Sequence, residues 1–155
     1  MWGYSMNIRF SAIALAAALA CSSFSVAHAQ NAARVYDNGP VWTISYIETK
    51  PAMFNDYMAY LAGPYRALQD AAKKRGEVLD YKVLQVDSPR DGEANLILMV
   101  QFKNMAVFDR SLAEGERDTA AVFGSLAQGQ QSQVKRGDMR TPRGGVTVRE
   151  MKFLK

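Results

Sequence analysis

The side chains best suited to chemistry are confined to one end of the chain. The only cysteine and the only histidine, Cys21 and His28, both lie within the first 29 residues. Those residues have the composition of a cleavable export signal, so the mature chain would lack both side chains. Thiol and imidazole nucleophiles, disulfides, and thiolate or imidazole metal ligands are thereby excluded from it. Carboxylates, hydroxyls, aromatic rings, arginine and lysine remain for binding or catalysis.

The export signal has three parts with separate roles. Arg9 supplies a positive charge, residues 10–20 form an uncharged segment rich in Ala and Leu, and Ala27-His28-Ala29 offers a small-x-small cleavage site. The apolar segment has about 11 residues, whereas a membrane-spanning helix needs roughly 20. We therefore expect cleavage after Ala29 and a periplasmic or secreted protein without a stable membrane span.

Two other interpretations of the first 29 residues stay open. The segment could remain uncleaved as an anchor. It could also be a lipoprotein signal ending at Cys21, although Leu19 lies one position too late for the usual lipoprotein motif. Either Met1 or Met6 could be the first residue, because the sequence from Met6 begins a more compact signal.

Length and charge indicate a single mature domain with a mild positive charge. Removing 29 of the 155 residues leaves 126, and these carry 18 basic and 15 acidic side chains, a net charge of +3. A domain of this size buries roughly two-thirds of its unfolded surface, enough for a core without disulfides. So small an excess of positive charge predicts no nucleic-acid partner. We expect a disordered or extended lead-in over 30–40 and one domain over 41–155.

Alternating β-branched and aromatic residues predict four strands, over residues 41–48, 78–86, 95–102 and 146–154. On the first strand Trp42, Ile44 and Tyr46 share one face, while Val41 and its alternate neighbours share the other. Turn residues at 88–93 leave only a short connection between the second and third strands. This spacing indicates an antiparallel hairpin.

A first helix is predicted after Lys50-Pro51, where apolar residues recur at three- and four-residue steps. The stripe consists of Phe54, Met58, Leu61, Tyr65, Leu68 and Ala72, widened by Tyr57. Gly63-Pro64 should kink this helix near Tyr60 or Leu61, because proline removes a backbone hydrogen bond. Gly76 is typical of its C-terminal end.

A second helix is predicted after the capping residue Asn104, with an inward face made of Met105, Phe108 and Leu112. A further helical stretch is expected over 119–127, after a break at Gly115. Residues 128–145 are rich in Gln, Gly and Arg and show no apolar periodicity. We therefore expect a loop there.

The predicted order of strand, helix, strand, strand, helix and strand is the ferredoxin-like arrangement, an α+β fold with helices on one face of an antiparallel sheet. The other face of such a sheet is exposed, and here it would carry apolar residues in either register. Large apolar patches on soluble proteins usually mark a partner surface. The sequence therefore predicts a homodimer in which two sheet faces stack into one barrel.

The chain resembles the dimeric α/β-barrel superfamily over residues 41–155. Four segments carry the resemblance: GPVWTISYIETKPAMFNDYMAYL, EVLDYKVLQV, NLILMVQFKNMAVFD and VTVREMKFLK. The chain is most similar to small exported proteobacterial members of unassigned activity, and more distantly to antibiotic-biosynthesis and haem-degrading monooxygenases. This resemblance implies a dimeric ferredoxin-like barrel rather than a particular reaction.

The residues that those distant monooxygenases use do not map onto this sequence. The resemblance implies Asn, Trp and His side chains that position substrate or haem, yet the mature chain has no histidine to ligate haem. Trp42 lies on a predicted strand rather than a helix, and neither Asn95 nor Asn104 has the motif context of a catalytic asparagine. We therefore expect no bound cofactor and no metal.

An aromatic and amphipathic set of side chains could line a cleft between helices and sheet: Trp42, Tyr46, Tyr57, Tyr65, Arg66, Tyr81 and Phe108. Apolar walls with a few polar groups are typical of small-molecule sites. Tyrosine hydroxyls can donate hydrogen bonds, and arginine can hold a carboxylate or phenolate. Each of these residues could instead have a purely structural role. The aromatic residues could belong to the core, and Arg66 could lie on the exposed surface of the helix.

Three functions are compatible with these features. The preferred hypothesis is a periplasmic binding or accessory protein for a small apolar or aromatic ligand, with no assigned reaction. The first alternative is a cofactor-independent monooxygenase or isomerase acting on a phenolic substrate, with Tyr46, Tyr81 or Arg66 polarising an oxygen. The second alternative is a structural or assembly protein without a ligand.

Charged residues give weaker signals. Asp80 with Lys82, and Glu150 with Lys152, could form cross-strand ion pairs or could simply be solvated. The predicted loop contains four basic residues that could attract an anion or lipid headgroups: Lys135, Arg136, Arg140 and Arg143. Soluble surface is the competing interpretation for this stretch.

Overall fold

The computed structural model describes residues 34–155, which form one compact unit. The predicted export signal over 1–29 and the first residues of the predicted lead-in lie outside this described part. Both therefore remain predictions. Among the described residues, no helix is long and apolar enough to cross a membrane.

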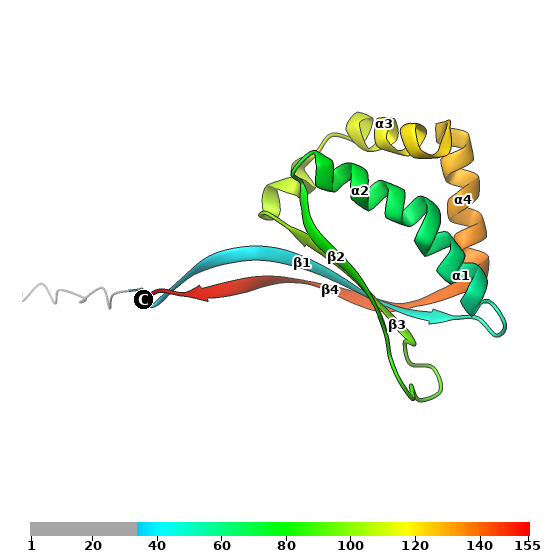
Figure 1. Cartoon of the computed structure of the whole chain (residues 1–155), viewed down its shortest axis with the longest axis horizontal. Helices are drawn as coiled ribbons and strands as arrows, with labels where there is room; N and C mark the ends of the chain where they lie inside the picture. The colour runs from blue at the N-terminus through cyan, green and yellow to red at the C-terminus, as the bar shows by residue number, and fades with distance from the viewer. Residues whose placement is uncertain (1–33) are drawn as a thin grey trace, which may run out of the picture. The chain divides into compact units, whose positions relative to one another are not determined.

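The described chain forms a four-stranded antiparallel sheet with the order β2-β3-β1-β4 (Figure 1). Its strands are β1 (Tyr36–Thr49), β2 (Val78–Gln85), β3 (Leu96–Phe102) and β4 (Arg140–Phe153). This topology confirms the predicted α+β class and the hairpin formed by β2 and β3. β1 already begins at Tyr36, so the last residues of the expected lead-in belong to the sheet and pair with the end of β4.

The helices lie on one side of the sheet (Figure 1). They are α1 (Phe54–Tyr60), the π-helical segment η1 (Leu61–Tyr65), α2 (Arg66–Lys74), the 3₁₀ helix η2 (Met105–Asp109), α3 (Leu112–Phe123) and α4 (Leu126–Met139). The core lies between this layer and the sheet, where Ile47, Leu96 and Leu98 pack against Tyr57 and Leu61. Burial of these side chains is the main force that holds the helices on the sheet.

The predicted kink in the first helical stretch is confirmed, and it takes the form of a π-helical turn between α1 and α2. Pro64 has no N–H to donate to the carbonyl of Tyr60, and Gly63 leaves helical geometry with φ −95° and ψ −107°. The turn keeps both Tyr60 and Tyr65 buried. α2 then ends near Gly76, whose φ of +75° suits a residue without a Cβ.

The prediction of an inward stripe on a helix starting after Asn104 is wrong. Asn104 does accept a hydrogen bond from Ala106 N at 3.0 Å, but it caps only the short η2. The next helix, α3, begins only at Leu112, after Ser111, which forms a capping box with Glu114. Leu112 is then 87 % exposed, and Phe108 is also exposed.

The prediction of a loop over 128–145 is also wrong, because α4 and the first half of β4 occupy this stretch. Ser125 caps α4 by accepting a hydrogen bond from Gln128 N at 3.1 Å. Gly129 lies directly against Thr119 and Phe123 of α3, where a Cβ would have no room. Packing against α3, rather than an apolar stripe of its own, therefore stabilises this helix.

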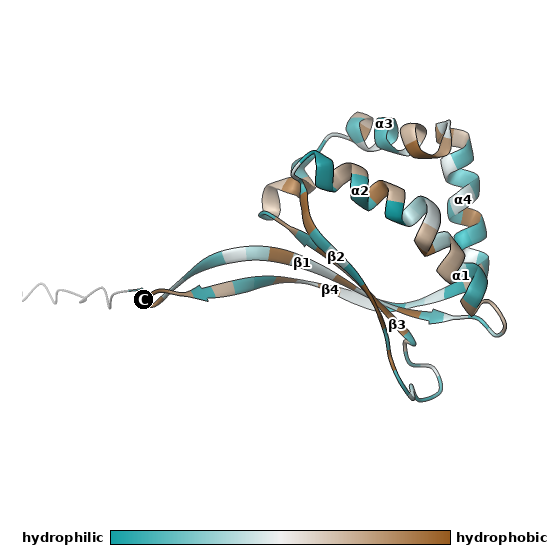
Figure 2. Cartoon of the chain, viewed as in Figure 1, coloured by the Kyte–Doolittle hydropathy of each residue, from teal (hydrophilic) through white to brown (hydrophobic). Residues whose placement is uncertain are grey.

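The uncovered sheet face carries alternate residues of all four strands. They are Trp42, Ile44 and Tyr46 of β1, Leu84 of β2, Ile97 and Met99 of β3, and Val146 and Val148 of β4. Figure 2 shows hydrophobic stretches along these strands. Leu84, Val146 and Val148 are exposed, so this face is apolar and without cover from residues 34–155.

Candidate functional site

The structure separates the seven side chains predicted to line one cleft. Trp42 and Tyr46 lie on the uncovered sheet face. Four others lie on the helix side of the sheet: Tyr57, Tyr65, Arg66 and Tyr81. Phe108 lies on η2, where its ring contacts Phe102 edge-on with centroids 5.5 Å apart. The helix side therefore holds the largest share of the predicted set.

Three tyrosines of the helix side meet two arginines to form what we call the tyrosine–arginine cluster: Tyr57, Tyr60, Tyr65, Arg136 and Arg140. The rings of Tyr57 and Tyr60 are nearly parallel, with an interplanar angle of 8° and centroids 6.1 Å apart. The guanidinium carbon of Arg136 lies 5.5 Å from the Tyr60 ring centroid, and that of Arg140 lies 6.0 Å from the Tyr57 centroid. Each cation thus faces the negative side of an aromatic ring.

The topology explains how these residues come together. Tyr57 and Tyr60 belong to α1, and Tyr65 ends the π-helical segment η1. Arg136 lies in the last turn of α4. Arg140 begins β4 and pairs with Thr49 on the helix-covered side of β1, while Lys50 N donates to Met139 O at 3.0 Å beside it. Segments some 80 residues apart in sequence thereby contribute to one cluster.

Four buried polar atoms of the cluster have no hydrogen-bond partner among residues 34–155: Tyr57 Oη, Tyr65 Oη, Arg136 Nε and Arg140 Nε. Tyr57 is fully buried and Tyr65 is 7 % exposed. Buried polar groups in proteins are almost always hydrogen-bonded. Four orphaned atoms in one cluster therefore mark it as a place where a further hydrogen-bonding group belongs.

The electrostatics of the cluster are those of a cationic site in an apolar setting. Burial lowers the pKa of Arg140, and the neighbouring charge of Arg136 lowers it further. Burial raises the pKa of Tyr65 to about 12, partly opposed by Arg136. Within residues 34–155, no carboxylate lies within the 4.0 Å of an ion pair from either guanidinium. The cluster therefore carries positive charge without an internal counter-charge.

A shallow apolar cleft of about 270 Å³ lies beside the cluster. It is lined by Met58, Leu61, Ala62, Tyr65, Arg66, Tyr81 and Val83. The Tyr81 hydroxyl donates to Asp70 Oδ1 at 2.7 Å, and this hydrogen bond raises the pKa of Tyr81. Arg66 Nε lies 3.5 Å from the other oxygen of Asp70. Asp70 therefore occupies the hydroxyl hydrogen of Tyr81, whereas Arg66 makes only one long contact with it.

Trp42 and Tyr46 have polar neighbours at the margins of the uncovered face. Lys82 Nζ lies 5.6 Å from the Trp42 ring centroid. Tyr46 borders a hollow of about 350 Å³, together with Ile97 and Arg143. Arg143 Nε donates to Glu48 Oε2 at 2.6 Å. The apolar centre of this face is therefore flanked by paired charges.

A second pair of arginines lies at the other end of the helix layer, in a network with two carboxylates. Arg75 Nη2 lies 2.9 Å from Glu77 Oε2 and 2.7 Å from Asp118 Oδ2. Arg110 contacts the same two oxygens at 3.1 and 2.9 Å. This network joins α2, the start of β2, η2 and α3, so its role is to hold these elements together.

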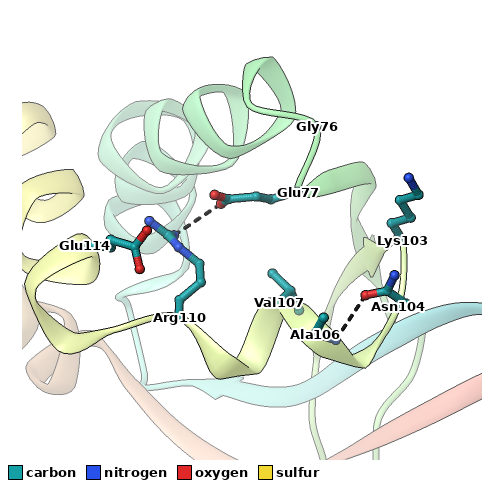
Figure 3. A pocket seen from close by; sticks show the side chains of 8 residues that line it. All are labelled: Gly76, Glu77, Lys103, Asn104, Ala106, Val107, Arg110 and Glu114. Atoms are coloured by element: carbon teal, nitrogen blue, oxygen red, sulfur yellow. Dashed lines mark hydrogen bonds and ion pairs between the residues drawn. The ribbon is translucent and has the colours of Figure 1, made fainter.

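A pocket of about 260 Å³ adjoins this network, with Glu77 and Arg110 among its lining residues. Figure 3 shows the Arg110 guanidinium directed at Glu77, and the Lys103 side chain extending away from this pair. Glu77 and Arg110 are therefore paired with each other at this pocket. Among residues 34–155, no three His, Cys, Asp or Glu side chains gather as metal ligands.

Comparisons with known proteins agree with this architecture. No protein-family model matches the sequence, and the search of curated proteins finds no match. Among solved structures, HapK from Hahella chejuensis superposes with a TM-score of 0.50 at 10 % identity, over 71 % of this chain and 91 % of HapK. The chain has a ferredoxin-like fold.

Two further solved structures give lower TM-scores. A protein from Shewanella oneidensis gives a TM-score of 0.48 at 15 % identity, covering 76 % of this chain and 98 % of its own. A protein from Bacteroides fragilis is described as dimeric, ferredoxin-like and of unknown function. It gives a TM-score of 0.41 at 11 % identity, covering 74 % of this chain and 97 % of its own. At such identities the likeness concerns the fold alone.

The ferredoxin-like domain contains functional candidates that the pocket prediction left out. Arg136 and Arg140 were expected in a basic loop that could attract an anion, without any link to the tyrosines. Their spacing of four residues gives no helical signal, because α4 ends at Met139 and Arg140 is the extended first residue of β4. The helix itself is hidden in the sequence, because residues 128–139 lack apolar periodicity.

Proposed function

We propose that this protein is a homodimer that binds a small molecule between its helix layer and its sheet. The observation that carries the proposal is the apolar sheet face, which nothing in residues 34–155 covers. An exposed apolar face of this kind is expected to pack against a partner in water. Ligand binding is supported by the tyrosine–arginine cluster and the apolar cleft next to it.

The distribution of charge on the uncovered face favours a second copy of the chain as its occupant. At the β2 edge Asp80 and Lys82 form an ion pair of 3.9 Å, and toward the β4 edge Glu48 pairs with Arg143. Each edge therefore offers both signs of charge. A two-fold partner presenting the same face can match opposite charges around an apolar centre, which is the usual anatomy of an interface.

Sheet geometry supports the same arrangement. Two twisted sheets pack face to face about 10 Å apart when their inner faces carry interdigitating apolar side chains. β1 and β4 each contain 14 residues, and they run beyond the helix layer as a two-stranded ribbon (Figure 1). A two-stranded ribbon is only marginally stable alone. A second copy would therefore also support this extension.

A single charge placed on the face tests the dimer. Wild-type protein should have the mass of a dimer in multi-angle light scattering and native mass spectrometry, and Val148→Glu should be monomeric. Val134→Glu is the matched control, because Val134 is an exposed valine on α4, away from this face. A monomeric wild type, or a Val148→Glu protein that remains dimeric, would contradict the proposal.

We further propose that the dimer acts after export, in the periplasm. The support is the three-part signal over residues 1–29 and the absence of Cys and His after it. N-terminal sequencing of protein recovered from the periplasmic fraction should begin at Gln30. Protein that retains Met1 or Met6 and stays in the cytoplasm would contradict export.

A further inference from the structure

The unpartnered polar atoms of the tyrosine–arginine cluster include more hydrogen-bond donors than acceptors. Its four orphaned atoms are two guanidinium Nε–H groups and two phenol hydroxyls. Guanidinium groups only donate, whereas a phenol donates its single hydrogen and can also accept. The cluster thus contains four unused donors, which come from α1, η1, α4 and β4. An acceptor group could use all four.

Charge narrows the choice of acceptor. Arg136 and Arg140 bring two positive charges into a partly buried place, and no carboxylate of residues 34–155 lies within ion-pair distance of them. Gln133 Oε1 lies 3.4 Å from Arg136 Nη1, and the Tyr57 side chain beside Arg140 favours its charged form. Buried cations without counter-charge are costly, so an anionic acceptor would be favoured over a neutral one.

The number of donors matches one common anion. A carboxylate has two oxygens and about four lone-pair positions, which equals the four unused donors. Arginine Nε–H groups bind carboxylates in short, charge-assisted hydrogen bonds. The apolar cleft of about 270 Å³ shares Tyr65 with the cluster and adds the Tyr81 side chain to its walls. An aromatic ring attached to the carboxylate could pack in such a cleft.

We infer that the tyrosine–arginine cluster binds a small aromatic carboxylate, with Arg136, Arg140, Tyr57 and Tyr65 donating to its oxygens. This inference rests on the proposed ligand-binding function and names the class of its ligand. Arg136 and Arg140 are only partly buried. Solvent therefore reaches part of each side chain, while its Nε atom is buried.

Isothermal titration calorimetry on the full-length dimer tests the inference with three probes. Benzoate should bind saturably, and neutral benzamide of nearly the same shape should bind at least tenfold more weakly. Acetate should also bind at least tenfold more weakly than benzoate, because it lacks the ring. Equal affinities for benzoate and benzamide would overturn the carboxylate assignment, and equal affinities for benzoate and acetate would overturn the aromatic one.

Three variants assign the binding to the cluster. Arg140→Gln should weaken benzoate binding by roughly 10- to 100-fold, as expected for a charged hydrogen bond, and Tyr65→Phe should weaken it several-fold. Arg117→Gln, at an exposed position on α3, makes the same change of charge and should bind like wild type. An unchanged benzoate affinity in Arg140→Gln would show that benzoate does not bind at the tyrosine–arginine cluster.

The dimer mass and circular dichroism spectrum of each variant distinguish the possible failures. A folded dimer that binds benzamide as well as benzoate would keep the proposed ligand-binding function and reject the inference. A folded dimer that binds no probe would reject the inference while leaving the dimer intact. A monomeric wild type would reject the proposed assembly, whatever its affinity for benzoate.

Discussion

Two pairs of arginines in this domain have opposite surroundings. Arg75 and Arg110 share the carboxylates of Glu77 and Asp118, with four contacts between 2.7 and 3.1 Å. Arg136 and Arg140 instead lie over tyrosine rings, and their Nε atoms have no partner among residues 34–155. The first pair is neutralised within the fold, whereas the second retains unused charge and unused donors.

The difference indicates which pair is structural and which is free to bind. A guanidinium that already contacts two carboxylates has little to gain from an added anion, because its donors are occupied. A guanidinium stacked on a ring keeps its in-plane N–H groups available. Stability should therefore depend on the first pair, and ligand affinity on the second.

The largest expected effect on stability concerns the neutralised pair. Asp118→Ala removes an acceptor that serves both Arg75 and Arg110, so the free energy of unfolding should fall by about 2 kcal/mol. Asp109→Ala, at an exposed position of η2, should change it by less than about 0.5 kcal/mol. Urea denaturation measures both variants. Equal stability of the two would remove the structural role assigned to this network.

An intermediate effect should appear at alkaline pH in the tyrosine–arginine cluster. Burial raises the pKa of Tyr65 from 10.0 to about 12, so the folded state holds its proton more tightly than the unfolded state. The resulting stability is complete below pH 10 and is lost as the pH rises through 12. Each pH unit between 10 and 12 should cost about 1.4 kcal/mol, and this component should be absent from Tyr65→Phe.

Urea denaturation at pH 9 and pH 11 checks this prediction in both proteins. Other groups titrate equally in wild type and variant, so the difference between the two proteins isolates Tyr65. An identical pH dependence in wild type and Tyr65→Phe would show that this hydroxyl is not buried as described.

The smallest expected effect separates an orphaned hydroxyl from a bonded one at neutral pH. Tyr65→Phe removes a hydroxyl without a partner, so the free energy of unfolding should change by no more than about 0.5 kcal/mol. Tyr81→Phe removes the donor of the 2.7 Å bond to Asp70 and should cost about 1 kcal/mol. A larger loss in Tyr65→Phe than in Tyr81→Phe would contradict the assignment.

The sheet could be predicted from the sequence because its signals are local. The alternation around Trp42 and Ile44 fixes which residues share a face, and the turn at 88–93 fixes the hairpin. The break caused by Gly63-Pro64 was predictable for the same reason, since proline acts on its own backbone. These features need no information about distant parts of the chain.

The candidate site could be predicted only in part, because it depends on tertiary packing. Tyr57 and Tyr65 were in the predicted set on account of their helical spacing. Arg136 and Arg140 join them only because α4 forms, and α4 is held by contacts of Gly129 with α3 that no periodicity reveals. Trp42 and Tyr46, predicted in the same cleft, instead face away from the helices, as strand alternation requires.

The central claim is that the donors of Arg136 and Arg140 are free for a carboxylate while those of Arg75 and Arg110 are occupied. Nuclear magnetic resonance of the arginine Nε–H groups tests it directly, with benzoate titrated into the labelled dimer. The account predicts that the Nε–H signals of Arg136 and Arg140 move to lower field and saturate, while those of Arg75 and Arg110 stay in place. Unmoved signals at Arg136 and Arg140, or equal shifts in all four, would contradict it.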